Sequence, residues 1–93
     1  MAQPENAYTV EFTDIAINNL KRFPANDQRR ILSKIEQLAA NPLAMPNVKR
    51  LVNFEATYRL RIGDYRVLFD RDDTIRIIDV LDVLPRSRAY RRS

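Results

Sequence analysis

The sequence predicts one α+β domain of the order β-α-α-β-β-β, in which a mostly antiparallel sheet carries an αα-hairpin on one face. Three observations predict this fold. Residues 8–12 alternate and are rich in β-formers, residues 14–40 hold two consecutive amphipathic segments, and Gly63-Asp64 separates two alternating runs. Alternation is typical of strands with one buried face, whereas apolar spacing of three and four residues is typical of helices. A chain of 93 residues allows one core, so we expect residues 1–93 to form a single domain.

The first strand is expected at Tyr8–Phe12 (YTVEF), and a helix follows it directly. Thr13 is a suitable N-cap, and Asp14 in the first turn suits the positive end of the helix dipole. We expect this helix to run from Asp14 to Phe23, because Pro24 cannot continue it.

A second helix is expected from about Pro24 or Asn26 to Ala40. Apolar residues recur along it at helical spacing, with charged residues on the opposite face. The apolar stripe consists of Ile31, Leu32, Ile35, Leu38 and Ala39. Asn41-Pro42 stops the helix. The short joint between the two helices predicts an αα-hairpin.

The second half of the chain has the pattern of a sheet. We expect a strand at Val48–Asn53 and a β-hairpin over residues 58–69. Residues 70–73 (DRDD) form a polar turn, which lacks the spacing of a calcium loop and is expected to be solvated. Residues 74–84 carry apolar side chains at both parities, which suits a strand inside the sheet that is covered on both faces. Pro85 ends this strand.

The hairpin is the most informative stretch of the chain (YRLRIGDYRVLF). A two-residue loop with Gly63 at positive φ sets its register. The facing pairs are then Ile62 with Tyr65, Arg61 with Arg66, Leu60 with Val67 and Arg59 with Leu68. Side chains alternate between the faces of a strand, so Arg59, Arg61 and Arg66 share one face, and the helices cover the other. We expect the arginine face to remain open to solvent or ligand.

Directly opposed like charges destabilise a sheet by up to about 1 kcal/mol per pair. The arginine face is therefore expected to bind an anion, either a polyanionic substrate or an acidic partner. The alternative is a solvated face on which Asp64, Asp79 or Asp82 neutralises the arginines.

Composition narrows the chemistry. The chain has no cysteine and no histidine, which excludes a disulfide framework, a thiolate zinc site and the usual general acid–base residue. We expect no metal and no cofactor. The formal net charge is +4, and the whole basic excess falls in residues 49–93, which favours a nucleic-acid partner only weakly. No stretch suits a transmembrane helix and the N-terminus lacks the signal-peptide pattern, so a cytoplasmic protein without a membrane partner is expected.

Two further basic groups are candidates for binding. The tail after Pro85 (RSRAYRRS) carries Arg86, Arg88 and Tyr90, which either fray in solvent or fold back beside the arginine face. An aromatic ring among arginines suits base stacking. Lys49-Arg50 begins the second expected strand and is either an ordinary strand edge or a further RNA contact.

The whole pattern resembles the RelE/ParE superfamily of type II toxins. The resemblance covers residues 8–90 and is most specific in the hairpin block, with Asn41-Pro42 before it and the R-x-x-x-Y pattern of Arg86 and Tyr90 after it. It implies a small toxin that forms a hetero-oligomer with its cognate antitoxin. RelE-like members enter the ribosomal A site and cleave mRNA, where the ribose 2′-oxygen attacks the adjacent phosphate without a metal. ParE-like members poison DNA gyrase instead.

The resemblance also implies residue roles. The catalytic positions fall on Arg59, Arg61, Arg66, Arg86 and Tyr90. Arg61 and Arg66 would stabilise the pentacovalent phosphate, whereas Lys49, Arg50 and Arg88 are expected to bind RNA. Arginine cannot remove a proton at ordinary pH. Tyr90 is therefore the first choice for the general base, with Lys49 and Glu55 as alternatives.

These observations lead to one expected function and two alternatives. We expect a ribosome-dependent mRNA endonuclease that inhibits translation. The first alternative is a gyrase inhibitor without nuclease activity. The second is a binding module without catalytic activity, whose arginine face holds an acidic antitoxin segment.

Overall fold

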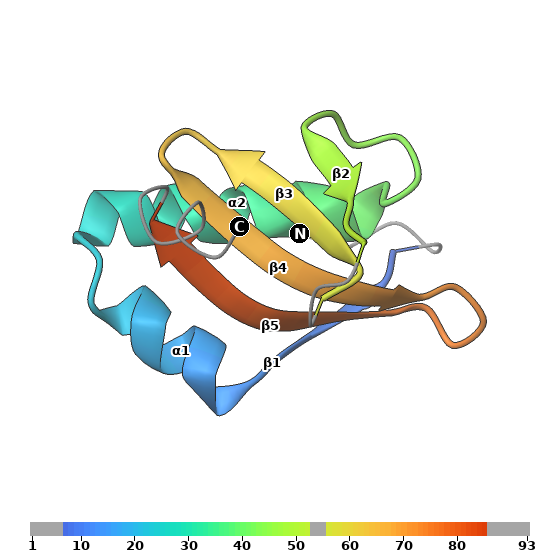
Figure 1. Ribbon diagram of the computed structural model, residues 1–93, viewed down its shortest axis with the longest axis horizontal. Helices are drawn as coiled ribbons and strands as arrows, with labels where there is room; N and C mark the ends of the chain where they lie inside the picture. Colours follow the sequence, from blue (N-terminus) through green and yellow to red (C-terminus); the bar gives the residue numbers. More distant parts are fainter. Residues whose placement is uncertain (1–6, 53–55, 86–93) are drawn as a thin grey trace.

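The computed structural model describes residues 7–52 and 56–85 and shows a mixed sheet with helices on one side (Figure 1). Its elements are β1 (Thr9–Phe12), α1 (Asp14–Lys21), α2 (Ala25–Ala40), β2 (Val48–Arg50), β3 (Tyr58–Ile62), β4 (Tyr65–Asp72) and β5 (Ile77–Pro85). The five strands lie in the order β1-β5-β4-β3-β2. Among the strands of the described residues, only β1 and β5 pair in parallel. The predicted α+β class and mostly antiparallel sheet are confirmed. All five strands expected from the residues are present, so the order β-α-α-β-β-β omitted one of them.

The joint between the two helices forms where the sequence predicts it. Thr13 is the N-cap of α1, and its hydroxyl accepts from the backbone N–H of Ala16 at 3.1 Å. The helix ends at Lys21 rather than at Phe23, because the following N–H groups bond three residues back and tighten the last turn. Pro24 then serves as the N-cap of α2.

The core lies between α2 and the sheet, and α2 runs behind the strands in Figure 1. Ile31, Ile35 and Leu38 are buried on the helix side. The sheet contributes Leu60, Ile62, Val67, Phe69, Ile78, Val80 and Val83. The prediction that the helices cover the apolar face of the hairpin is therefore confirmed. Leu32 is an exception to the expected apolar stripe, because 42% of its surface is exposed.

The turn between β4 and β5 lies further along the chain than predicted. β4 continues to Asp72, through most of the expected polar turn, and β5 begins only at Ile77. One Asp72 carboxylate oxygen accepts from the N–H groups of Thr74 and Ile75, which fixes a side-chain-capped turn after the strand. Arg76 completes the turn with φ of 55°.

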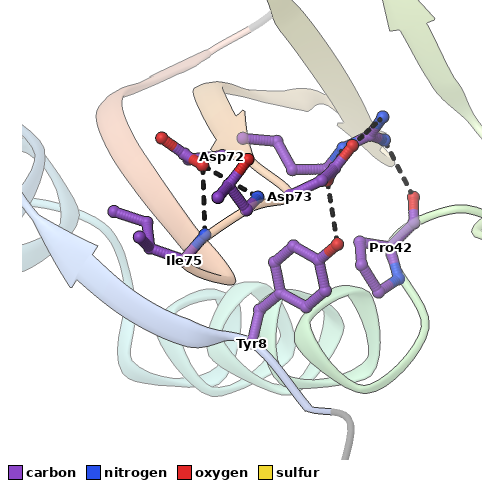
Figure 2. A network of polar contacts seen from close by, with 7 residues as sticks. Tyr8, Pro42, Asp72, Asp73 and Ile75 are labelled. Atoms are coloured by element: carbon purple, nitrogen blue, oxygen red, sulfur yellow. Dashed lines mark hydrogen bonds and ion pairs between the residues drawn. The ribbon is translucent and has the colours of Figure 1, made fainter.

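A polar network closes this end of the molecule (Figure 2). The Tyr8 hydroxyl donates to Asp73 at 2.8 Å, and Arg71 pairs with the same carboxylate at 2.8 Å. Arg71 also donates to the carbonyl of Pro42 and lies 4.7 Å from the ring centre of Tyr58. We call Tyr8, Pro42, Arg71 and Asp73 the far-end network. It joins the start of β1, the loop after α2 and the β4–β5 turn.

Candidate functional site

The β3–β4 hairpin has the predicted register. Arg61 lies opposite Arg66 and Ile62 opposite Tyr65, and the other expected pairs are also present. Gly63 has φ of 55°, and Asp64 is not among the residues with positive φ. This combination is that of a type II′ turn, whose twist matches the flanking strands. The side chains of the facing arginines therefore share one face of the sheet, away from α2.

β2 adds a further cation to this face. Lys49 lies opposite Arg59, and directly opposed residues share a face. We call Lys49, Arg59, Arg61 and Arg66 the basic face. Among the described residues, Lys49, Arg59 and Arg61 form no ion pair. Arg50 lies opposite Tyr58 instead, so the structure separates it from Lys49 and directs it to the opposite face.

The arginines of the basic face differ in exposure. Arg61 is exposed and Arg59 is half-buried, but only 2% of the Arg66 surface is accessible. Arg66 Nη1 donates to the carbonyls of Gly63 (3.0 Å) and Tyr65 (2.9 Å). The expectation that all three arginines lie open to solvent is therefore wrong for Arg66. Its guanidinium folds back on the hairpin turn, because two backbone carbonyls there replace water as acceptors.

The hairpin turn is anchored to the start of α2. The Tyr65 hydroxyl donates to Asp27 Oδ2 at 2.7 Å, and the Tyr65 ring lies 4.6 Å from that of Phe23. The hydrogen bond to the Asp27 carboxylate, aided by burial, raises the pKa of Tyr65 above its usual 10.0. Arg30 approaches Gly63 so closely that a Cβ there would lie 3.3 Å from Arg30 Nη2.

Sequence reasoning missed these two helix residues. Asp27 and Arg30 were expected only as members of the charged face of the second helix. Nothing in their spacing shows that they reach the hairpin, because the sequence does not place the turn relative to α2. The signal that exists is indirect, since a glycine can mark a close approach of neighbouring atoms.

The aspartates that could have neutralised the arginines have other partners or positions. Asp82 accepts from Asn19 Nδ2 at 2.6 Å and from the N–H of Val83 at 2.8 Å. Asp79 lies opposite Asp70, several residues along the sheet from the hairpin turn. Within residues 7–52 and 56–85, neither Asp79, Asp82 nor Asp64 forms an ion pair with the basic face.

Three of the expected site residues cannot be placed. Arg86, Arg88 and Tyr90 lie outside the described residues, as does Glu55, and their roles stay predictions. In the part of the chain that the structure describes, no group of acidic side chains could hold a metal ion. No helix there is long and apolar enough to cross a membrane.

A groove of about 370 Å³ lies between β1 and α2. Apolar side chains of Val10, Phe12, Leu32 and Ile35 line it together with Glu36. The partial exposure of Leu32 is explained by its position in this groove. β1 is also an edge of the sheet, so its outer backbone groups have no strand partner among the described residues.

The structure is that of a small α+β domain whose β3–β4 hairpin carries a cluster of cations on the face away from α2. Comparison with known proteins identifies the family to which this domain belongs. Residues 10–90 match the family described as the ParE toxin of the type II toxin–antitoxin system parDE. A protein of Methanocaldococcus jannaschii that carries the toxin name RelE1 is 30% identical over 90% of this chain and 96% of its own length. The chain belongs to the RelE/ParE superfamily of type II toxins.

Solved structures agree with this assignment. The fold is similar to that of the archaeal RelE–RelB complex from Pyrococcus horikoshii OT3, with a TM-score of 0.76 and 28% identity over 88% of this chain and 98% of that chain. It is also similar to the toxin–antitoxin complex RelBE2 from Mycobacterium tuberculosis, with a TM-score of 0.74 and 30% identity over 86% and 99% of the two chains.

Proposed function

We propose that this chain is a ribosome-dependent mRNA endonuclease, the toxin of a type II toxin–antitoxin pair. The observation that carries the proposal is the basic face. Two like-charged pairs, Lys49–Arg59 and Arg61–Arg66, lie directly opposite each other across neighbouring strands. Such pairs cost stability in the free protein, and a phosphodiester bound between them would remove that cost. Relatives that carry the name RelE support the nuclease reading over a purely structural one.

The proposed reaction needs a general base, a general acid and groups that stabilise negative charge on the phosphate. The ribose 2′-oxygen forms a bond to phosphorus and loses its proton to a base, while the bond to the 5′-oxygen breaks and that oxygen gains a proton. Arg61 and Arg66 stabilise the extra negative charge of the pentacovalent phosphate, because guanidinium groups donate in pairs to phosphate oxygens. The carbonyls of Gly63 and Tyr65 hold Arg66 Nη1, and only 2% of Arg66 is accessible. Arg66 therefore acts on the phosphate only when its guanidinium turns out of the hairpin, whereas the exposed Arg61 can bind the phosphate directly.

The sequence offers three candidates for the general base, with Tyr90 as the first choice and Lys49 and Glu55 as the alternatives. Lys49 is the member of the basic face that can release a proton at ordinary pH, since the other members are arginines. Lys49→Met, Tyr90→Phe and Glu55→Gln, each in an otherwise unchanged chain, separate the three. The base is the residue whose replacement removes the acidic limb of the pH–rate profile.

Primer extension on translated mRNA tests the function. Wild type should cut the message inside ribosomes, and Arg61→Ala and Arg66→Ala should cut it at least about 100-fold more slowly. Arg76→Ala, at the exposed β4–β5 turn, is the matched control and should cut normally. Absence of cleavage by wild type rejects the nuclease. Equal cleavage by Arg61→Ala and wild type rejects the basic face as its site.

Gyrase inhibition is the second candidate, and one observation favours it. The matching family model describes ParE toxins. A supercoiling assay with the purified chain separates the candidates. Inhibited supercoiling without mRNA cleavage would establish the gyrase reading, whereas growth without any defect on expression of the chain alone would favour the non-catalytic binding module.

An antitoxin is the expected protein partner under both toxin readings. The relatives of known structure from Pyrococcus and Mycobacterium are found in complexes with RelB or as RelBE2. The groove beside β1 is suited to part of such a partner, because an extended segment can pair with the free strand edge and place apolar side chains beside Leu32 and Phe12. Leu32→Glu should weaken the complex without changing cleavage by the free toxin.

A further inference from the structure

The sheet face that lies away from α2 carries a second row of like charges. Glu11 on β1, Asp79 on β5 and Asp70 on β4 lie directly opposite one another across three neighbouring strands. The core residues Phe69 and Val80 alternate with them along β4 and β5, so these carboxylates lie on the face away from α2. We call Glu11, Asp70 and Asp79 the acidic row.

The acidic row has no cationic partner within the described residues. Asp70 accepts from the N–H and the hydroxyl of Thr57, which are neutral donors. None of the three carboxylates forms an ion pair in this part of the chain. The row is spread across the sheet, with about 4.8 Å between neighbouring strands, and does not gather into a group that could hold a metal ion. Facing carboxylates repel each other, so the row is suited to cationic side chains on the surface of another protein.

The basic face lies on the same side of the sheet as the acidic row. Arg66 and Asp70 are four residues apart on β4 and therefore share a face, with about 13 Å between them along the strand. The basic face extends to β2 and the acidic row extends to β1, and these strands are the two edges of the sheet (Figure 1). One face of the molecule thus has a basic part and an acidic part.

We propose that two copies of this chain associate through this face, with the basic face of each copy against the acidic row of the other. A two-fold rotation that turns the faces toward each other exchanges their basic and acidic parts, so each charged contact occurs twice. The exposed Lys49 and Arg61 of a second copy supply the cations that the acidic row lacks. Exposed ion pairs are weak and screened by salt, so we expect a weak pair that separates at high salt.

The pair covers the basic face of both copies. A second copy and a phosphodiester then compete for the same cations, so the paired chain does not cleave RNA. This consequence rests on the proposed function and goes beyond it, since it makes the toxin least active where it is most concentrated. The association itself does not depend on the proposed function.

The test is analytical ultracentrifugation of the full chain over a series of protein concentrations, at low and at high salt. Glu11→Lys/Asp79→Lys makes the face mostly basic, and Lys49→Glu/Arg61→Glu makes it mostly acidic. Each double reversal places like charges against each other twice, so each variant alone should associate at least about 10-fold more weakly than wild type. An equimolar mixture of the two variants should form a mixed pair with about the wild-type affinity, because both sets of contacts are again complementary.

Two controls guard against indirect effects. Glu36→Lys and Lys34→Glu each reverse an exposed charge on α2, behind the sheet, and both variants should associate like wild type. Association in the mixture also shows that both double variants are folded, since a misfolded chain does not restore a specific pair.

Each outcome decides the inference. If wild type stays monomeric at every concentration at low salt, the inference is wrong, whether or not the chain cleaves mRNA. If wild type associates but the double variants associate equally well, the interface lies elsewhere and the inference is also wrong; loss of association in Leu32→Glu would then place it at the groove beside β1. If wild type and the mixture associate as expected but wild type does not cleave translated mRNA, the inference stands and the proposed function is rejected.

Discussion

The two ends of the sheet differ in the partners of their charged side chains. At the β4–β5 end, Asp73 binds Tyr8 and Arg71, Asp72 caps its own turn, and Asp70, which lies opposite Asp79, accepts from the N–H and hydroxyl of Thr57. At the hairpin end, two pairs of cations, Lys49–Arg59 and Arg61–Arg66, face each other across strands, and Arg66 bonds to two backbone carbonyls of the turn. The comparison supports the proposal that the β4–β5 end stabilises the fold and the hairpin end binds a ligand, because a bound anion would relieve the repulsion between facing cations.

Removing two cations from the basic face should have the largest effect and should change activity and stability in opposite directions. Arg59→Gln/Arg61→Gln is expected to slow mRNA cleavage about 100–1000-fold, because it removes donors to the transition state. The free energy of unfolding should stay the same or rise by up to about 2 kcal/mol, since two like-charged pairs disappear. Cleavage assays and urea unfolding measure the two quantities. A clear loss of stability would show that these arginines support the fold.

A substitution in the far-end network is expected to lower stability and to leave cleavage unchanged. Arg71→Met keeps the unbranched apolar part of the side chain but loses the ion pair with Asp73, the bond to the Pro42 carbonyl and the contact with Tyr58. We expect a loss of about 2 kcal/mol, which corresponds to a fall in Tm of about 10 °C for a domain of this size. Cleavage by the folded protein should be unchanged. Arg76→Met, in the neighbouring turn, serves as the control and should melt like wild type.

The fold was predictable because its local signals agree with one another. Thr13 before a helical stripe, Pro24 between the helices and Gly63-Asp64 between alternating runs each have one favoured structure, and all three formed as predicted. The limits of the strands were less predictable. The β4–β5 turn lies further along the chain than predicted because the Asp72 side chain caps it. Turn propensity alone does not show which aspartate of residues 70–73 caps the turn.

The strand register of the candidate site was predictable from the sequence, but the burial and the neighbours of its side chains were not. Alternation and the loop length set Arg61 opposite Arg66, as found. The burial of Arg66, the bond from Tyr65 to Asp27 and the approach of Arg30 to Gly63 depend on where α2 lies relative to the hairpin. That placement comes from packing across the core, between segments more than thirty residues apart in the chain. No periodicity in the sequence encodes it.

Replacing Gly63 should lower both the stability of the protein and its rate of mRNA cleavage. Gly63 has φ of 55° and lies against Arg30, so Gly63→Ala should cost about 1 kcal/mol of stability, mostly from the left-handed backbone. Cleavage should also slow, because the carbonyl of Gly63 holds Arg66. Gly63→Asn should have smaller effects on both, since asparagine tolerates this conformation. If Gly63→Ala and Gly63→Asn lose equal stability, contact with Arg30 rather than the backbone decides the cost.

The smallest expected effect concerns a device that both ends share, a tyrosine hydroxyl bonded to an aspartate. The bond to Asp73 raises the pKa of Tyr8, and the bond to Asp27 raises that of Tyr65, above the usual 10.0. The folded protein therefore holds each phenolic proton more tightly than the unfolded chain does. The two hydrogen bonds stabilise the folded state fully below pH 10, and this stabilisation is lost as the pH rises through the raised pKa values of the folded protein.

Urea unfolding between pH 8 and pH 11 should therefore show that the free energy of unfolding declines with pH. This decline should be shallower in Tyr8→Phe and in Tyr65→Phe than in wild type. Of these two variants, only Tyr65→Phe should also slow cleavage at neutral pH, because Tyr65 supports the turn that holds Arg66. Equal cleavage by Tyr8→Phe and Tyr65→Phe would contradict the division between a stabilising end and a binding end.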